Sequence, residues 1–297
     1  TFNYNQSVSG LKLILWGLFK KVVIADALGP LVDDIFTNYN SYPSSTLILG
    51  AVFFSFQIYG DFSGYSDIAI GTAKLFGIEL MSNFKFPYFS RNIGEFWRRW
   101  HISLSSWFQA YIYVPLGGSR HGKYKTIINV FIVFLISGFW HGANWTFILW
   151  GLLHAIIFIP LLVLGQNTKY KNTILAEHSK LPSLKEFFSV LFVFSIVTFC
   201  WIFFRSESIT DAFGFIGRIF TNFSYLSYNH PMGYRMTDYY ILILFFVFYE
   251  FLIRKDERSP FNFKSKVLRF VIYTIIIFCM LLFYDDNIDR SFIYFQF

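Results

Sequence analysis

The chain has 297 residues, of which 55% are hydrophobic and only 14% are charged. Soluble domains carry about 25% charged residues, so the composition excludes an ordinary water-soluble protein and favours a membrane protein. The net charge of +7 fits Lys and Arg gathered in loops that face the cytoplasm and anionic lipid. No basic helix or RNA-type aromatic motif accompanies this charge, so nucleic acid is not an expected partner.

The first two hydrophobic stretches contain or approach charged residues. Residues 11–28 form a candidate span that includes Lys20, Lys21 and Asp26, and residues 46–59 run into Asp61. The second stretch continues as GDFSGYSDIAIG, in which Asp61, Ser63, Ser66 and Asp67 are the polar residues. Its serine is displaced from a nucleophile elbow, and its carboxylates lack the spacing of a calcium loop. The structural alternative is a helix N-terminus capped by Asp61 or Ser63.

Residues 84–122 are rich in aromatic side chains, cations, Pro and Gly, and we expect amphipathic helices and a re-entrant segment there. In EFWRRWHISLSSW, Glu95 stands three and four residues before Arg98 and Arg99, so these side chains are neighbours on a helix. An interfacial helix explains both arginines but leaves His101 unexplained. The following PLGGSRHG is expected to be a cytoplasmic turn, with a phosphate-binding loop as the weaker alternative.

Clear membrane spans follow, each needing about 20 apolar residues. They are residues 127–137 running up to His141, 145–164, 187–204, 239–253 and 267–283. The basic loops 165–186 and 254–269 are expected in the cytoplasm. The sparsely basic loop 206–237 and the tail with Asp285, Asp286 and Asp289 are expected outside.

His141 lies within the apolar stretch FLISGFWHGANWTFILW. An ionisable group in a span costs at least a few kcal/mol, so it indicates either a function or a paired structural site. The structural alternative is a core histidine bonded to a carbonyl, with Gly138 and Gly142 serving close helix packing. His154, thirteen residues later, is expected on another helix face in a packing or hydrogen-bonding role.

Three stretches together resemble the membrane-bound O-acyltransferase family. They are QIYGDFSGYSDIAIG, FPYFSRNIGEFWRRWHISLSSWF with YIYVPLGG, and SGFWHGANWTFILWG. They are most similar to the bacterial branch that O-acetylates alginate and other exported or cell-wall polysaccharides, closely over residues 10–151. The resemblance implies an all-α polytopic membrane protein around a central channel. It implies a single domain over residues 1–297 that lacks spans present ahead of it in relatives.

The resemblance also implies roles for particular residues. His141 matches the family's essential histidine, His101 its second characteristic histidine, and Asp61 the acidic residue of its D-F-S-G-Y-S-D motif. Gln109 and Ala110 replace a basic–acidic pair of many relatives, so no role of that pair is carried over.

The chemistry of acyl transfer to a hydroxyl suggests further roles for these residues and their neighbours. His141 is expected to act as the base that activates a hydroxyl, and His101 and Asn144 to orient it or stabilise the oxyanion. Asp61 is expected to support the site, and Arg98 and Arg99 to receive an anionic donor from the cytoplasm. No metal and no bound cofactor are expected, because the substrate itself, acetyl-CoA or an acyl-carrier protein, brings the activated acyl group.

We therefore expect a multi-pass protein of the bacterial cytoplasmic membrane that transfers an acyl group, first of all acetyl, toward a polysaccharide. Expected partners are membrane lipid, the polysaccharide acceptor, a periplasmic acetyltransferase and polysaccharide export proteins. One alternative is D-alanyl or other acyl transfer to teichoic acid. Another is a transporter or flippase subunit, without enzyme activity, whose histidines relay protons.

Overall fold

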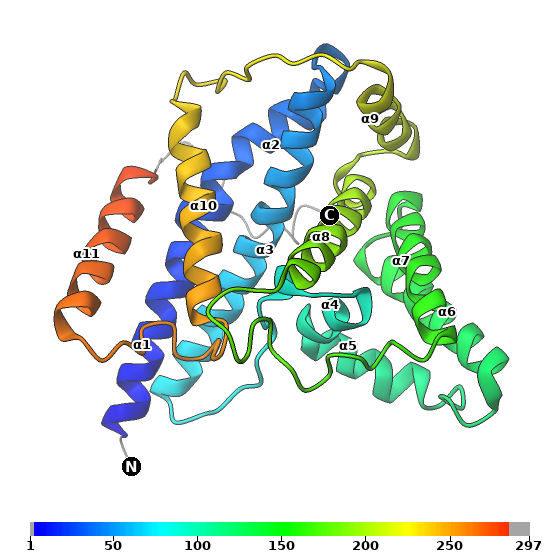
Figure 1. The fold of residues 1–297 in the computed structure, drawn as a ribbon, viewed down its shortest axis with the longest axis horizontal. Helices are drawn as coiled ribbons and strands as arrows, with labels where there is room; N and C mark the ends of the chain where they lie inside the picture. Colours follow the sequence, from blue (N-terminus) through cyan, green and yellow to red (C-terminus); the bar gives the residue numbers. More distant parts are fainter. Residues whose placement is uncertain (1–2, 285–297) are drawn as a thin grey trace. The chain divides into compact units, whose positions relative to one another are not determined.

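A computed structural model describes residues 3–284, which fold into helices and connecting turns with no strand in that range. The chain divides into two compact units (Figure 1). The first comprises the residues up to Tyr42, Ile48–Ser82 and the residues from Tyr225 onward. The second comprises Pro43–Leu47 and Asn83–Ser224. One functional domain across the whole chain stays a prediction, and the acidic tail predicted to be external lies outside the described residues.

Within residues 3–284, five helices are long and apolar enough to cross a membrane. They are α3 (Ser44–Leu75), α6 (Gly122–His141), α7 (Trp145–Val163), α8 (Leu184–Arg205) and α10 (Met236–Ile253). The predicted all-α, multi-pass fold is therefore confirmed. The span predicted at residues 267–283 forms α11 (Lys266–Leu282), which at 17 residues is shorter than these five. The central channel stays a prediction.

The front of the first unit is one long helical run, α1 (Tyr4–Phe19), the π-helical turn η1 (Lys20–Asp26) and α2 (Ala27–Thr37). It approaches α3 closely at paired glycines. A Cβ at Gly10 would lie 2.6 Å from the carbonyl oxygen of Gly71, and one at Gly17 would lie 2.6 Å from that of Gly64. Small residues let helix backbones meet in this way inside a membrane. The lysines and carboxylates carried by the two helices are thereby brought within reach of one another.

Asp61 and Ser63 lie inside the 32-residue helix α3, so the alternative that either caps a helix N-terminus is wrong. The helix continues through this polar stretch because the Asp61 carboxylate has a cationic partner at 2.5 Å, the Lys21 ammonium. Gly60 and Gly64 are tolerated there because each faces the backbone of the η1 region at close range.

In the second unit, α6 and α7 form an antiparallel hairpin that α8 packs against (Figure 1). A Cβ at Gly138 would lie 2.4 Å from the carbonyl oxygen of Phe147, and one at Gly151 would lie 2.4 Å from that of Phe134. The packing role predicted for Gly138 is therefore confirmed. Gly142, in contrast, lies against the Phe147 ring at the turn of the hairpin.

The segment between α3 and α6 consists of short helices. It contains the 3-10 turn η3 (Pro87–Phe89), α4 (Ile93–Arg99), α5 (Ile102–Phe108) and the π-helical turn η4 (Gln109–Tyr113). The seven-residue helices α4 and α5 are each about 10 Å long, too short to cross a bilayer. PLGGSRHG forms the predicted turn, in which the Asn129 amide donates to the carbonyl oxygens of Leu116 and Gly118.

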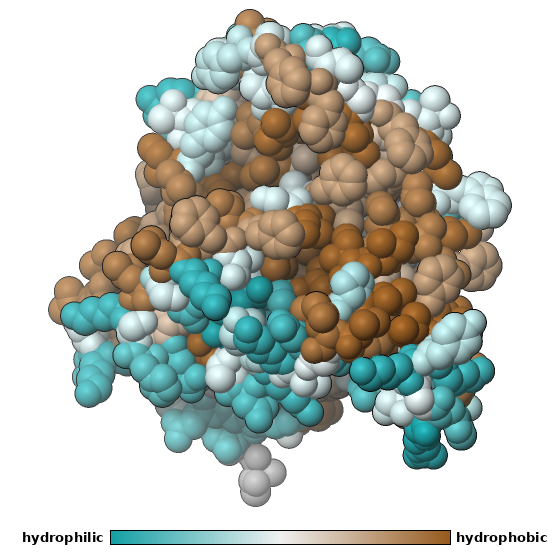
Figure 2. All heavy atoms as spheres, turned by 45° about the vertical axis from the view of Figure 1, so that its right-hand side comes forward, coloured by the Kyte–Doolittle hydropathy of each residue, from teal (hydrophilic) through white to brown (hydrophobic). Residues whose placement is uncertain are grey.

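Much of the molecular face in Figure 2 consists of hydrophobic side chains. Large apolar side chains are exposed along α7 and α8, among them Ile156, Val163, Leu191 and Phe192. Such surface suits contact with lipid acyl chains rather than water. The remaining helix of this unit, α9 (Ile209–Thr221), follows α8.

Candidate active site

The two histidines singled out by the sequence lie in the second unit and contact the same indole. The ring centroids of His101 and Trp140 are 6.1 Å apart, and those of Trp140 and His141 are 5.0 Å apart. His141 is the last residue of α6, whereas His101 directly precedes α5. Residues 40 positions apart in the sequence are therefore gathered at one place, as the acyltransferase hypothesis requires.

Three further aromatic rings surround the half-buried His141 imidazole. Its ring centroid lies 5.1 Å from Trp150, 5.1 Å from Phe204 and 6.4 Å from Phe147. These rings come from α7 and α8, so two neighbouring helices pack against the imidazole at the end of α6. A wall of this kind limits water around a reacting group while leaving the ring nitrogens to provide the chemistry.

His101 is 8% exposed and has left-handed backbone angles, with φ at 45°. Such a conformation costs of order 1–3 kcal/mol in a residue other than glycine and persists only where the surroundings hold it. The Ile102 amide donates to the Asn83 carbonyl and the Lys85 amide to the Arg99 carbonyl, which ties the chain on both sides. Burial lowers the pKa of His101 to about 4, so its imidazole is neutral at physiological pH.

His154 lies in α7 and is fully buried among aromatic rings. Its centroid is 4.8 Å from that of Trp97 and 4.9 Å from that of Trp150. Neither ring nitrogen finds a hydrogen-bond partner among residues 3–284. The packing role is therefore observed, and Trp150 separates this histidine from His141.

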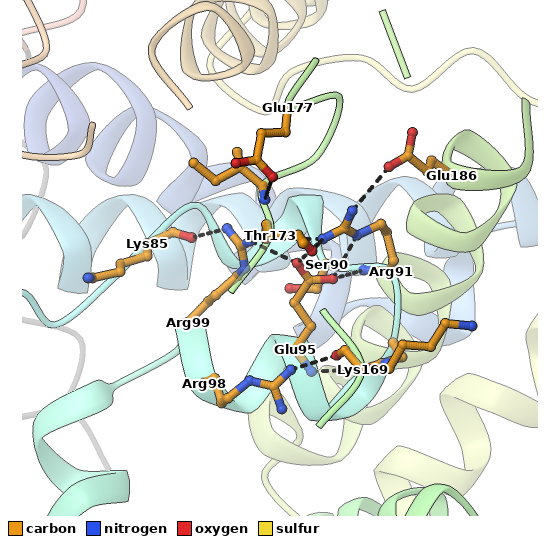
Figure 3. Close-up of polar contacts among 12 residues, drawn as sticks. Lys85, Ser90, Arg91, Glu95, Arg98, Arg99, Lys169, Thr173, Glu177 and Glu186 are labelled. Atoms are coloured by element: carbon orange, nitrogen blue, oxygen red, sulfur yellow. Dashed lines mark hydrogen bonds and ion pairs between the residues drawn. The ribbon is translucent and has the colours of Figure 1, made fainter. Parts of the chain in front are cut away.

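A polar cluster in this unit surrounds Glu95 (Figure 3). The Glu95 side chain is 1% exposed. Its carboxylate pairs with the guanidinium groups of Arg91 at 2.9 Å and Arg99 at 2.8 Å. The predicted contact of Glu95 with Arg99 is therefore confirmed, whereas Arg98 instead donates to the backbone carbonyls of Asn167 and Lys169. The arginines thus fasten the loop after α7 onto α4, and their predicted donor-binding role stays a prediction.

Asn144 and Asp61 were both predicted to support the site. The Asn144 side chain caps α7 by accepting from the Thr146 amide, and it donates to the Glu207 carbonyl at 2.9 Å. Asp61 belongs to the first unit, where it pairs with Lys21. Both roles toward the histidines stay predictions.

The structure adds residues that the sequence did not single out. Trp140 was visible only as one residue of the apolar stretch around His141, and Phe204 only as one residue of a span. Asn83 contacts His101 from 18 positions earlier in the sequence, and no motif marks it. Contacts between distant segments of this kind leave no local pattern from which they could be found.

Residues 1–204 match the membrane-bound O-acyltransferase family over more than half of the chain. The chain belongs to this family. The matched range includes His101, His141 and every other site residue named from the sequence.

Individual relatives resemble the same part of the chain. The peptidoglycan O-acetyltransferase of Helicobacter pylori is 41% identical over 210 residues, which are 71% of this chain and 38% of that protein. The probable alginate O-acetylase AlgI of Pseudomonas aeruginosa is 38% identical over 71% of this chain and 38% of its own length. The teichoic acid D-alanyltransferase of Streptococcus thermophilus is 34% identical over 51% of this chain and 39% of its own length. The chain thus spans about two fifths of the length of these relatives.

Proposed function

We propose that this protein is an enzyme that transfers an acyl group, in the first place acetyl, to hydroxyls of an exported or cell-surface polysaccharide. The observation that carries this proposal is the meeting of His101 and His141 at the Trp140 ring in a membrane protein of the O-acyltransferase family. Two imidazoles held by aromatic walls suit proton transfer at a site with little water.

In this mechanism the His141 imidazole takes the proton of the acceptor hydroxyl as its oxygen attacks the thioester carbonyl. The C–O bond forms and a tetrahedral oxyanion develops. This collapses with cleavage of the C–S bond, and the departing thiolate takes the proton from the His141 imidazolium. Positioned acid–base catalysis of this kind contributes about 10²–10⁴-fold to the rate.

The acyl donor is a cytoplasmic thioester, acetyl-CoA or an acyl-carrier protein, and no bound cofactor or metal takes part. The Arg98 guanidinium donates its hydrogen bonds to backbone carbonyls. It forms no salt bridge with a carboxylate among the described residues. Arg98 and Arg99 contribute positive potential that attracts the anionic donor. The protein works in the bacterial cytoplasmic membrane, with export proteins and a periplasmic acetyltransferase as partners.

The names of two relatives, which specify peptidoglycan and alginate, support the proposed acceptor class. The similarity to teichoic acid D-alanyltransferases supports a second candidate, D-alanyl transfer to teichoic acid, although it covers a smaller part of this chain. Both candidates use the same histidines and differ only in donor and acceptor.

The test compares cells that carry the full protein with His141→Ala or with His178→Ala, a control at an exposed histidine of the second unit. Acyl-ester content and the amount of exported polysaccharide are both measured. We expect His141→Ala to lower acylation by about 10²–10⁴-fold with polymer export intact, and His178→Ala to change neither. Loss of export with acylation retained on the remaining polymer would instead indicate a transporter.

A further inference from the structure

The side-chain oxygen of Asn83 lies at the centre of a small hydrogen-bond cluster beside His101. The Ser103 amide donates to Asn83 Oδ1 at 3.2 Å, and the Ser103 hydroxyl donates to the same atom at 3.0 Å. His101 Nδ1 is also 3.2 Å from this oxygen.

These contacts identify which end of the Asn83 amide faces the histidine. A backbone amide can only donate, so the atom that it meets must be the carbonyl oxygen and not the NH₂ group of Asn83. The same oxygen can only accept, so His101 Nδ1 must carry the hydrogen of their contact. A neutral imidazole has one N–H, and the lone pair is therefore on Nε2.

Ser103 does not offer His101 an alternative arrangement. Its hydroxyl is 3.5 Å from His101 Nδ1, longer than its 3.0 Å bond to Asn83. The hydroxyl hydrogen is used in that shorter bond and is not available to an unprotonated Nδ1. The Asn83 backbone is also fixed, because its carbonyl accepts the Ile102 amide at 2.9 Å.

We propose that Asn83 is a positioning residue that holds His101 in the Nδ1–H tautomer, so that Nε2 is the acceptor nitrogen during acyl transfer. A lone pair on Nε2 can accept a hydrogen bond from a second hydroxyl of the acceptor sugar, beside the hydroxyl that His141 deprotonates, and so orient the sugar toward the thioester. It cannot donate to the tetrahedral oxyanion, which excludes one of the two roles expected for His101. The consequence for catalysis rests on the proposed function, whereas the tautomer does not.

The test measures the tautomer by ¹⁵N NMR of the full protein, labelled at histidine and held in lipid nanodiscs. Protonated and unprotonated ring nitrogens have well-separated ¹⁵N shifts, and spectra are taken above about pH 8, where the neutral imidazole prevails. His101→Gln identifies the His101 signals. We expect Nδ1–H in the unaltered protein, a loss of that preference in Asn83→Leu, and its retention in Asn83→Asp.

Ser103→Ala is the matched control, because it removes one donor to Asn83 Oδ1 and leaves the bond to His101. Its His101 signals should keep the Nδ1–H pattern. An Nε2–H signal in the unaltered protein, or an Nδ1–H signal that persists in Asn83→Leu, would overturn the proposal.

Kinetics separate this inference from the proposed function. Asn83→Leu should lower kcat by about 10²–10⁴-fold, the range for a mispositioned or wrongly protonated catalytic histidine, with Asn83→Asp recovering most of the rate. If Asn83→Leu alters the tautomer but acyl transfer continues at the same rate, Nε2 of His101 is not the acceptor nitrogen during acyl transfer. If the unaltered protein transfers no acyl group while its tautomer depends on Asn83, the proposed function fails and the positioning stands.

Discussion

The lysines of the first unit and the three histidines of the second show two ways of holding an ionisable side chain inside a membrane protein. In the first, the Lys20 and Lys21 ammonium groups lie 2.5 Å from the carboxylates of Asp67 and Asp61, so each lysine has an anionic partner. In the second, the imidazoles of His101, His141 and His154 lie among aromatic rings. A paired charge is held in one protonation state, whereas a neutral imidazole can exchange a proton. The proposed function uses such exchange at His141, whereas His154 has a packing role.

The comparison is tested most strongly by removing one member of a buried pair. Lys20→Met should destabilise the protein by about 3–5 kcal/mol, because the Asp67 carboxylate loses the ammonium that compensates its charge. Thermal unfolding of the purified protein in detergent measures this loss. The double variant Lys20→Met/Asp67→Leu should recover most of it, since no isolated charge remains. A double variant as unstable as the single one would show that pairing with Asp67 does not account for the stabilising effect of Lys20.

The burial of His101 predicts that the stability of the folded protein decreases at acidic pH. Burial lowers the pKa of His101 to about 4, while the unfolded chain has an ordinary value of about 6.5. Above pH 6.5 neither state is protonated at this group. As the pH falls from 6.5 to 4 the unfolded state gains the proton first, so about 3 kcal/mol of stability is lost.

The control for this effect is His101→Gln, which cannot titrate. Thermal unfolding midpoints are measured for the unaltered protein and for His101→Gln between neutral pH and pH 4. The difference between the two midpoints should become smaller as the pH falls. A parallel decline of both midpoints would show that other groups cause the acid sensitivity.

The sequence was a good guide to elements that have a local pattern. Apolar runs predicted the spans that became α6, α7, α8 and α10, with the first of them running up to His141. The spacing of Glu95 and Arg99 predicted their ion pair. In each case the deciding interaction lies within a few residues along the chain.

The sequence did not predict features that depend on contacts between distant segments of the chain. The run through GDFSGYSD was open to interpretation as a helix start, because nothing local indicates that Lys20 and Lys21 neutralise its carboxylates from another helix. The Asn83 contact to His101 and the attachment of Arg98 to the loop after α7 have no local signal for the same reason. Such partners are set by packing, which a single sequence does not display.

The glycine contact of the α6–α7 hairpin tests whether the aromatic site depends on helix packing. Gly138→Ala places a methyl group 2.4 Å from the Phe147 carbonyl oxygen, so the helices must separate, at a cost of about 1–3 kcal/mol. His141 at the end of α6 should shift away from Trp150, with a fall in kcat. Gly217→Ala in α9 meets no atom within 4 Å and should be neutral or slightly stabilising. Equal losses in both variants would show a general response to added methyl groups.

The smallest expected effect separates two roles of Arg98. Its two hydrogen bonds fasten the loop after α7 and contribute about 1 kcal/mol in total at this partly exposed position, while its charge attracts the donor. Arg98→Lys keeps the charge but loses the planar fork that reaches both carbonyls. It should therefore speed amide hydrogen exchange in residues 166–171 and leave the KM for the acyl donor unchanged. Arg98→Gln should speed the same exchange and also raise that KM a few-fold, less so at high salt. If Arg98→Lys raises the KM as much as Arg98→Gln does, the arginine acts through the loop it holds, and the charge is not what the donor recognises.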